Sequence, residues 1–496
     1  MLTRVIFQAD VLEREASDVL SLIRSWRNKP TPISRVPPEV LTLIPDFWDG
    51  DDGEKAVITL THVCRAWREM FTSRSSLWTN FRCANADKTR VYLERSKSSP
   101  INLCLEKEDG LLPHDPLLQI APRAISRLKN VIISTTSDHL EDVTDYLSHP
   151  APLLETLKIF GGNDDPFFGP VLSTTTLFGG DLPSLRELCL GSVRTELSWR
   201  NMANLTTLAL YHMWHLTIGQ LLDFFESAPL LLNVELTFAT PKSGAQDGRL
   251  VSLARLRWLL IHGPDPASLL LDHMLIPAGA DMITHLDSPD FQIEDHLPRS
   301  LDNLRNLSNF TKIGVHFVRD LVSVKITGPN GRARLISTPD ELLDTSLLPR
   351  SLAILDTSKS ERLQIIKSGP PSEDLRQTLL SMNNLRTIAL SLCQDLHSFI
   401  LALNPNPNSM DPIPCPKLER LIFRTEEQFD IETMVDVAAA RALGGAPLRS
   451  VKIINHGVFV PREGVMELLK HVLHVETSDV IDGEAYDCSD DDDEED

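Results

Sequence analysis

Short apolar triplets alternate with polar segments along most of this chain. Each triplet has the form apolar-x-x-apolar-x-apolar and is followed by a polar or glycine-containing turn. The last two apolar positions are two residues apart, so both side chains point to one side of a short β-strand. The clear copies are Leu128/Val131/Ile133, Leu154/Leu157/Ile159, Leu185/Leu188/Leu190, Leu205/Leu208/Leu210, Leu231/Val234/Leu236, Leu256/Leu259/Ile261, Phe310/Ile313/Val315, Leu385/Ile388/Leu390, Leu418/Leu421/Phe423 and Leu448/Val451/Ile453.

The spacing of the triplets predicts a stack of similar units. Most successive copies begin 20 to 33 residues apart, the longer gap after Leu256 leaves room for a unit near Ile283 and Leu286, and residues 316–380 show no clear copy. One unit cannot bury its leucines alone, so neighbouring units must pack together. Periods of this length are typical of leucine-rich repeats. We therefore expect an α/β solenoid, curved like a horseshoe, over residues 82–475.

Helix signals fall between the strand triplets. Thr217-Ile-Gly-Gln220 matches a capping box, and Asp430 is placed to cap a helix that runs to Leu443. Ser137 and Ser372 precede further helical patterns. At the N-terminus, apolar residues at helical spacing predict a helix over residues 4–27, followed by a proline-rich connector.

Residues 33–81 form a separate segment with no strand triplet. An acidic loop at Asp49–Gly53 is expected to precede a helical stretch from Ala56 to Met70. About fifty residues bury too little surface for much stability of their own. The aromatic residues are dense for so short a piece, and such residues either fill a small core or anchor a partner. They are Phe47, Trp48, Trp67, Phe71, Trp78 and Phe81.

Three motifs in this segment carry a family resemblance. Val36-Pro37-Pro38-Glu39-Val40-Leu41 resembles the opening of an F-box, Val63-Cys64-Arg65-Ala66-Trp67-Arg68 resembles its second signature, and Ser76-Leu77-Trp78 its closing Leu-Trp. The chain is similar to fungal, mushroom-type F-box proteins, which commonly continue into degenerate leucine-rich repeats. Three features depart from the pattern. The first position of the opening motif is Val36 rather than leucine. Pro45 lies where the first helix would continue, and Asp49–Lys55 lengthen the connection to the second signature.

The resemblance implies that the segment docks on the Skp adaptor of a cullin–RING ubiquitin ligase. Trp67 and Leu77 are equally open to a role in the core of the segment. The residues that the resemblance places at the adaptor are Pro37, Glu39, Leu41, Ile44, Leu60, Val63, Cys64, Trp67, Leu77 and Trp78.

Charge and cysteine content narrow the function classes. The net charge is −21, and the 12 carboxylates of residues 476–496, which we expect to form an acidic disordered tail, account for more than half of it. No cluster of Lys and Arg suits a nucleic-acid partner. Seven widely spaced cysteines suggest neither a disulfide framework nor a zinc site. No membrane-length apolar run or secretory signal is present, so we expect a cytoplasmic or nuclear protein.

We find no catalytic motif, cofactor cradle or metal site, and we expect no enzyme activity. His212-Met-Trp-His215 has a spacing that suits metal ligands, but it lacks an apparent third ligand. Phosphate-binding glycine motifs and the Gly-x-Ser-x-Gly elbow are absent from the sequence.

The expected function is that of a substrate receptor. Residues 1–32 form a helix and linker, the F-box at 33–81 binds the Skp adaptor and the cullin core, and the repeats at 82–475 bind a target protein. The alternative is a repeat scaffold whose F-box has decayed and recruits no ligase. Candidate target-binding residues on the strand face and its loops are Tyr211, His212, Trp214, His262, His316 and Arg424.

Overall fold

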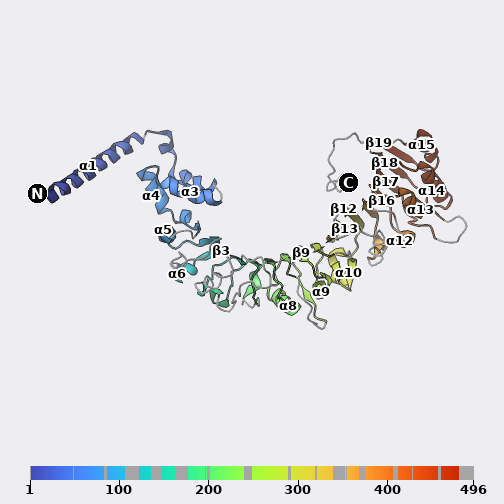
Figure 1. Cartoon of the computed structure of the whole chain (residues 1–496), viewed down its shortest axis with the longest axis horizontal. Coiled ribbons are helices and arrows are strands. Elements are labelled where there is room, and N and C mark those ends of the chain that lie inside the picture. The colour runs from blue at the N-terminus through green and yellow to red at the C-terminus, as the bar shows by residue number, and fades with distance from the viewer. Residues whose placement is uncertain are drawn as a thin grey trace. The chain divides into compact units, whose positions relative to one another are not determined.

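The computed structural model places most of the chain (Figure 1). The described residues are 2–28, 30–47, 50–82, 86–106, 122–135, 147–161, 177–195, 197, 201–239, 248–288, 292–318, 321–338, 352, 355–367, 375–405, 412–426, 428–455 and 460–479. The chain divides into two compact units, Met1–Leu205 and Thr206–Asp496. Each unit is a mixture of helices and strands, in agreement with the predicted α/β class.

The first unit begins with helices. Helix α1 (Leu2–Asn28) confirms the helix predicted over residues 4–27. The following segment is helical throughout. It consists of η1 (Pro32–Arg35), α2 (Pro38–Leu41), η2 (Ile44–Phe47), α3 (Gly50–Thr61), α4 (Arg65–Ser73) and η3 (Ser75–Trp78).

Two local predictions in this segment are wrong. Residues 50–53, expected as an acidic loop, belong to α3, where acidic residues near the amino end suit the helix dipole. The helical stretch expected from Ala56 to Met70 is two helices, because the chain turns at His62 and Val63 and Cys64 is extended with φ −158°. The first box helix is short: α2 has four residues, and η2, which contains Pro45, follows it.

A parallel sheet completes the first unit. Its strands pair in chain order and are β1 (Asn80–Arg82), β2 (Ile101–Glu106), β3 (Leu128–Thr135), β4 (Thr156–Gly161) and β5 (Glu187–Gly191). The first strand takes residues 80 and 81 from the segment predicted as the F-box, because they pair with Asn102 and Leu103 of β2.

The second unit continues with parallel strands in chain order, apart from one antiparallel section. Two short strands, β8 (Val251–Ser252) and β10 (Met274–Leu275), pair with each other. The strands of the large sheet are β6 (Thr207–Tyr211), β7 (Asn233–Thr237), β9 (Trp258–Gly263), β11 (Asp281–Leu286), β12 (Lys312–Val318), β13 (Leu321–Gly328), β14 (Gly331–Ser337), β15 (Arg362–Ile366), β16 (Thr387–Ser391), β17 (Arg420–Thr425), β18 (Ser450–Asn455) and β19 (His474–Asp479).

The predicted strand triplets are confirmed as the core. Every residue of the ten triplets is buried, and the most exposed of them, Phe310, is only 5% exposed. Their last two positions point inward from successive strands, so neighbouring strands bury each other's leucines, as in the register Leu208–Val234–Leu259. The alternate positions of the same strands form the opposite, outward face of the sheet.

The antiparallel section lies where the triplet pattern was unclear. Strands β12, β13 and β14 form a meander in which β14 pairs with β11 and β12 pairs with β15, so the parallel array continues on both sides. The extra strand near residue 283 is present as β11. Its inward residues are Met282, Thr284 and Leu286, and Ile283 faces outward, contrary to the expected position.

Helices connect the strands, and two of the predicted caps, Thr217 and Asp430, are confirmed. The helix start predicted at Ser372 lies outside the described residues. Helix α8 (Ile218–Ser227) begins with the complete capping box of Thr217 and Gln220. Helix α14 (Ile431–Leu443) is capped by Asp430, whose carboxylate accepts a hydrogen bond from the Thr433 amide at 3.0 Å. The other connecting helices are α5 (Ala86–Ser96), α6 (Pro122–Ile125), α9 (Ser268–Leu271), α10 (Ile293–His296), α12 (Leu375–Ser381), α13 (Leu396–Ala402) and α15 (Arg462–Leu468).

The sheet extends further than the predicted boundary at 475. Strand β19 continues to Asp479 because it pairs with β18, and Glu476 forms an ion pair with Lys452 at 3.1 Å. The rest of the predicted acidic tail, residues 480–496, and the helix expected after Ser137 lie outside the described residues. Within the described chain, no helix combines the length and apolar content needed to span a membrane.

Candidate functional site

Residues 33–81, predicted as an F-box and called the box segment below, have an aromatic core. Trp78 and Phe71 are buried, and the Trp78 Nε1–H donates a hydrogen bond of 2.8 Å to the Phe71 carbonyl oxygen. Helix α5, which follows the box segment, supplies further contacts to Trp78. The Tyr92 ring packs edge-on against Trp78 at 4.9 Å, and the Arg95 guanidinium lies 4.3 Å from the centre of the Trp78 ring. These contacts bury Trp78 within this chain.

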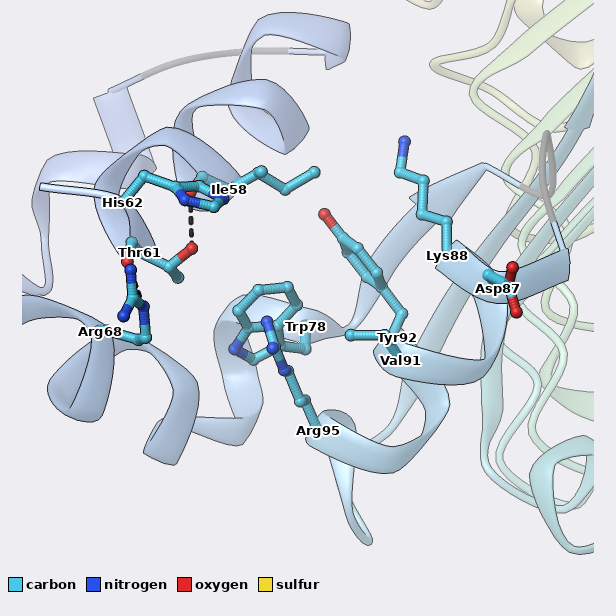
Figure 2. A pocket seen from close by; sticks show the side chains of 10 residues that line it. All are labelled: Ile58, Thr61, His62, Arg68, Trp78, Asp87, Lys88, Val91, Tyr92 and Arg95. Atoms are coloured by element: carbon cyan, nitrogen blue, oxygen red, sulfur yellow. Dashed lines mark hydrogen bonds between the residues drawn. The ribbon is translucent and has the colours of Figure 1, made fainter. Parts of the chain in front are cut away.

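A hollow of about 340 Å³ opens between α3 and α5 beside this core (Figure 2). Ile58 and His62 line one side, and Lys88 and Tyr92 line the other. Arg68 closes an edge by donating from Nε to the Thr61 carbonyl oxygen at 3.0 Å. The lining combines apolar side chains with cationic ones and with the acidic Asp87, a mixture that suits contact with another protein.

The predicted adaptor residues fall into three groups. Pro37, Glu39 and Val63 are exposed and free to contact a partner protein. Buried residues of the set can influence a partner only by holding the segment together. The buried members are Leu41, Leu60 and Trp78, and the half-buried members are Ile44, Cys64, Trp67 and Leu77.

Three apolar residues that the predicted adaptor set leaves out are more exposed than most of that set. Phe47 is 83% exposed, Val40 52% and Leu43 45%. They are three and four residues apart along α2 and η2. This helical spacing was the signal in the sequence that could have placed them on one face. With Val63, also on the surface, these residues give the box exposed apolar groups of the kind that partner proteins cover. We call Val40, Leu43, Phe47 and Val63 the exposed box residues.

A second site lies on the outward face of the sheet in the second unit. After β6 and β7 the chain continues with His212 at φ 54° and Phe238 at φ 51°. Their amides still extend the ladder, since His212 N–H donates to the Thr237 carbonyl oxygen at 2.8 Å and Phe238 N–H donates to the His262 carbonyl oxygen at 2.6 Å. The left-handed backbone at these two positions places aromatic rings at the same end of neighbouring strands.

These rings contact one another in a row from strand to strand, with two pairs stacked and two tilted. His212 lies parallel to Phe238 with ring centres 5.0 Å apart, and Phe238 lies 4.8 Å from His262. His262 continues onto His285 at 4.3 Å, with planes only 6° apart. Trp214 contacts Phe238 at 5.7 Å. We call these five residues the aromatic row; His212, Trp214 and His262 were predicted from sequence, and Phe238 and His285 were missed.

Electrostatics at one end of the aromatic row favour the neutral form of His285. Burial and the neighbouring His262 lower the pKa of His285 below its usual value. His262 is tied to a carboxylate, since its Nε2 lies 3.3 Å from Oδ2 of Asp287. His262, His285 and Asp287 together could hold a metal ion. However, the parallel imidazole planes keep the nitrogen lone pairs from converging on one point, so the present geometry suits stacking better than ligation.

The remaining predicted target residues share a single register row with His262. Pairing across the sheet connects Tyr211 to His262 through Thr237. Further pairings run from His285 through Ile336, Ser323, His316, Ile366 and Ser391 to Arg424. His316 and Arg424 are thus on the outward face but several strands from the aromatic row, at about 4.8 Å per strand.

The outward face from β12 to β18 is basic, in contrast to the chain as a whole. Alternation along each strand leaves cationic residues outward, opposite the buried positions. These residues are Lys312, Lys325, Arg332, Arg334, Arg362, Arg420, Arg424 and Lys452. Such a face attracts acidic segments of a partner protein.

A comparison with protein-family models finds no family that matches this chain, and a comparison with curated proteins finds no matching relative. The F-box resemblance therefore depends on the residues of this chain alone.

Proposed function

We propose that this protein is a non-catalytic substrate receptor of a Skp–cullin–F-box ubiquitin ligase. The observation that supports the adaptor role best is the group of exposed box residues on a helical segment whose aromatic core is already complete. A stable module with exposed apolar groups suits docking into an apolar cleft of another protein. We name the Skp adaptor as the partner because the three motifs of this segment resemble those of an F-box.

The sheet of the second unit would present the target protein, in the manner of a leucine-rich-repeat solenoid. The aromatic row offers large, rigid rings that bury area at low entropic cost, and the basic positions favour a target segment rich in carboxylates. The receptor itself would not transfer ubiquitin. It would act by holding the target near activated ubiquitin, which raises the effective concentration of the reacting groups.

The test is co-purification of the full chain with a fungal Skp adaptor. We expect wild type to be retained and Phe47→Asp or Val63→Asp to lose retention roughly tenfold or more, since a central interface contact contributes about 2 kcal/mol. Leu443→Asp is the matched control, because Leu443 is 91% exposed on α14 of the other unit. Failure of wild type to bind, while a known F-box protein binds in parallel, would overturn the adaptor role.

One observation favours a second candidate, an interaction scaffold without ligase recruitment. Helix α2 has only four residues and Pro45 follows shortly after it, so the first box helix offers little surface. A scaffold would capture the same target proteins but leave their cellular lifetimes unchanged when the exposed box residues are substituted.

A further inference from the structure

Helix α1 carries an apolar stripe that no other described part of the chain covers. Among its described side chains, Leu12 is 66% exposed, Val19 56% and Trp26 62%. At 27 residues, α1 is about 40 Å long. Most of the stability of a helix in water comes from packing of its apolar face, so a long helix with its stripe in solvent lacks its stabilising partner.

The stripe of α1 follows a strict seven-residue repeat. With positions lettered a to g, every a and d position of four successive heptads holds an apolar residue. A straight helix of 3.6 residues per turn drifts about 20° per heptad from such a repeat, so the stripe stays aligned only against another helix wound around it. The a positions are Leu2, Ala9, Ala16 and Ile23, and the d positions are Val5, Leu12, Val19 and Trp26.

We propose that two copies of this chain pair through α1 as a parallel two-stranded coiled coil. Two identical seams are self-complementary under a twofold axis, so each a or d layer meets the same layer of the second copy.

The charges beside the seam favour this parallel pair. In a parallel coil the g position of one copy faces the e position of the next heptad in the other, which sets Gln8 against Glu13 and Glu15 against Leu20. No like charges meet. The antiparallel pair of the same seam would bring Glu13 to Glu13 and Glu15 to Glu15, and like charges at such positions are destabilising.

The mass of the full chain in solution tests the pairing. Light scattering coupled to size exclusion should give twice the chain mass of 55.5 kDa for wild type and the single-chain mass for Leu12→Asp. The matched control is Ser17→Asp, at an exposed b position, which adds the same charge to the same helix and should remain a dimer. A wild-type mass of one chain, or a Leu12→Asp mass of two chains, would overturn the proposal.

Two further measurements separate pairing from other effects. Leu12→Asp should leave the thermal unfolding of the rest of the chain unchanged, since Leu12 is 66% exposed within a single chain. After oxidation, Trp26→Cys should form more disulfide-linked dimer than wild type, because only a parallel pair brings the two copies of residue 26 together. If the amount of covalent dimer does not increase, the parallel arrangement is excluded. The pairing does not depend on the proposed adaptor role, so adaptor retention and oligomeric mass can fail independently.

Discussion

The Trp78 indole donates a hydrogen bond to the Phe71 carbonyl oxygen at 2.8 Å, and this contact joins the last turn of the box to helix α4. Both side chains are buried, and the Arg95 guanidinium of α5 lies over the indole ring of Trp78. The closing Leu-Trp motif, predicted as part of the adaptor contact, thus places its tryptophan in the core of the segment. Its neighbour Leu77 remains half-buried and available to a partner.

Trp78→Ala should destabilise the box by about 3–5 kcal/mol, the usual cost of deleting a large buried aromatic side chain. The substitution removes edge-on packing with Tyr92 and leaves the Phe71 carbonyl without its donor. Hydrogen exchange of the amides in α4 and α5 would measure the loss. Trp26→Ala, on exposed α1, is the control and should leave those amides protected; equal protection in both variants would contradict the core role of Trp78.

Stability of the second unit should fall below pH 6.5 because of His296. This side chain is buried between Thr284 Oγ1 and Ser337 Oγ, each 2.9 Å from a ring nitrogen, and burial lowers its pKa from 6.5 to about 3. Between these two values the unfolded chain binds a proton that the folded chain does not. The stabilisation is therefore complete above pH 6.5 and decreases as the pH falls toward 3.

The expected loss attributable to His296 is about 2 kcal/mol between pH 6.5 and pH 5, at about 1.4 kcal/mol per pH unit. Hydrogen exchange in β11 and β14, corrected for the intrinsic pH dependence of exchange, would measure it. His296→Gln keeps hydrogen-bonding groups but cannot titrate, so its pH slope should be shallower than that of wild type. An unchanged slope in this variant would assign the pH dependence to other groups, such as His285.

The strand positions were predictable from the sequence because they obey one local rule. A triplet such as Leu418/Leu421/Phe423 needs only alternation and stacking to place it in the core, and capping residues such as Thr217 and Asp430 act within one turn of their helix. The meander β12–β14 was not predictable, because its order depends on pairing between β11 and β14 across about fifty residues, and adjacent buried residues such as Ser323 and Val324 obscure the alternation.

The candidate sites were predictable only in part, for a physical reason. Tyr211, His262, His316 and Arg424 do share one register row of the sheet, but which residues touch depends on backbone angles. Phe238 joins the aromatic row because its φ is 51°, and nothing local in the sequence marks a phenylalanine for that conformation. The box signatures identified the positions of the motifs but not which of their side chains are exposed. Trp78 is buried because α5 packs against it, whereas Phe47 is exposed.

Arg441→Met should destabilise the second unit by roughly 3 kcal/mol or more. Arg441 is fully buried in α14 and donates to three carbonyl oxygens, those of Leu403, Pro414 and Cys415, at 2.8 to 3.2 Å. Removing it leaves buried acceptors unsatisfied, at about 1–3 kcal/mol each. Arg441→Lys should recover little, because one ammonium cannot span the three acceptors. Thermal unfolding measures both variants, and a wild-type midpoint for Arg441→Met would contradict this role.

Phe238→Ala should reduce capture of target proteins by the full chain while leaving adaptor retention intact. Phe238 contacts His212, Trp214 and His262. Its removal therefore leaves His212 and Trp214 without their ring contact to His262 and His285. Quantitative affinity capture would compare wild type with Phe238→Ala and with Leu392→Ala, which has a similar left-handed backbone after β16, far from the row. Proteins lost with Phe238→Ala but kept with Leu392→Ala and Phe47→Asp are the expected targets. If all three variants capture the same proteins as wild type, target binding does not use the aromatic row, and the basic positions from β12 to β18 become the surface to substitute next.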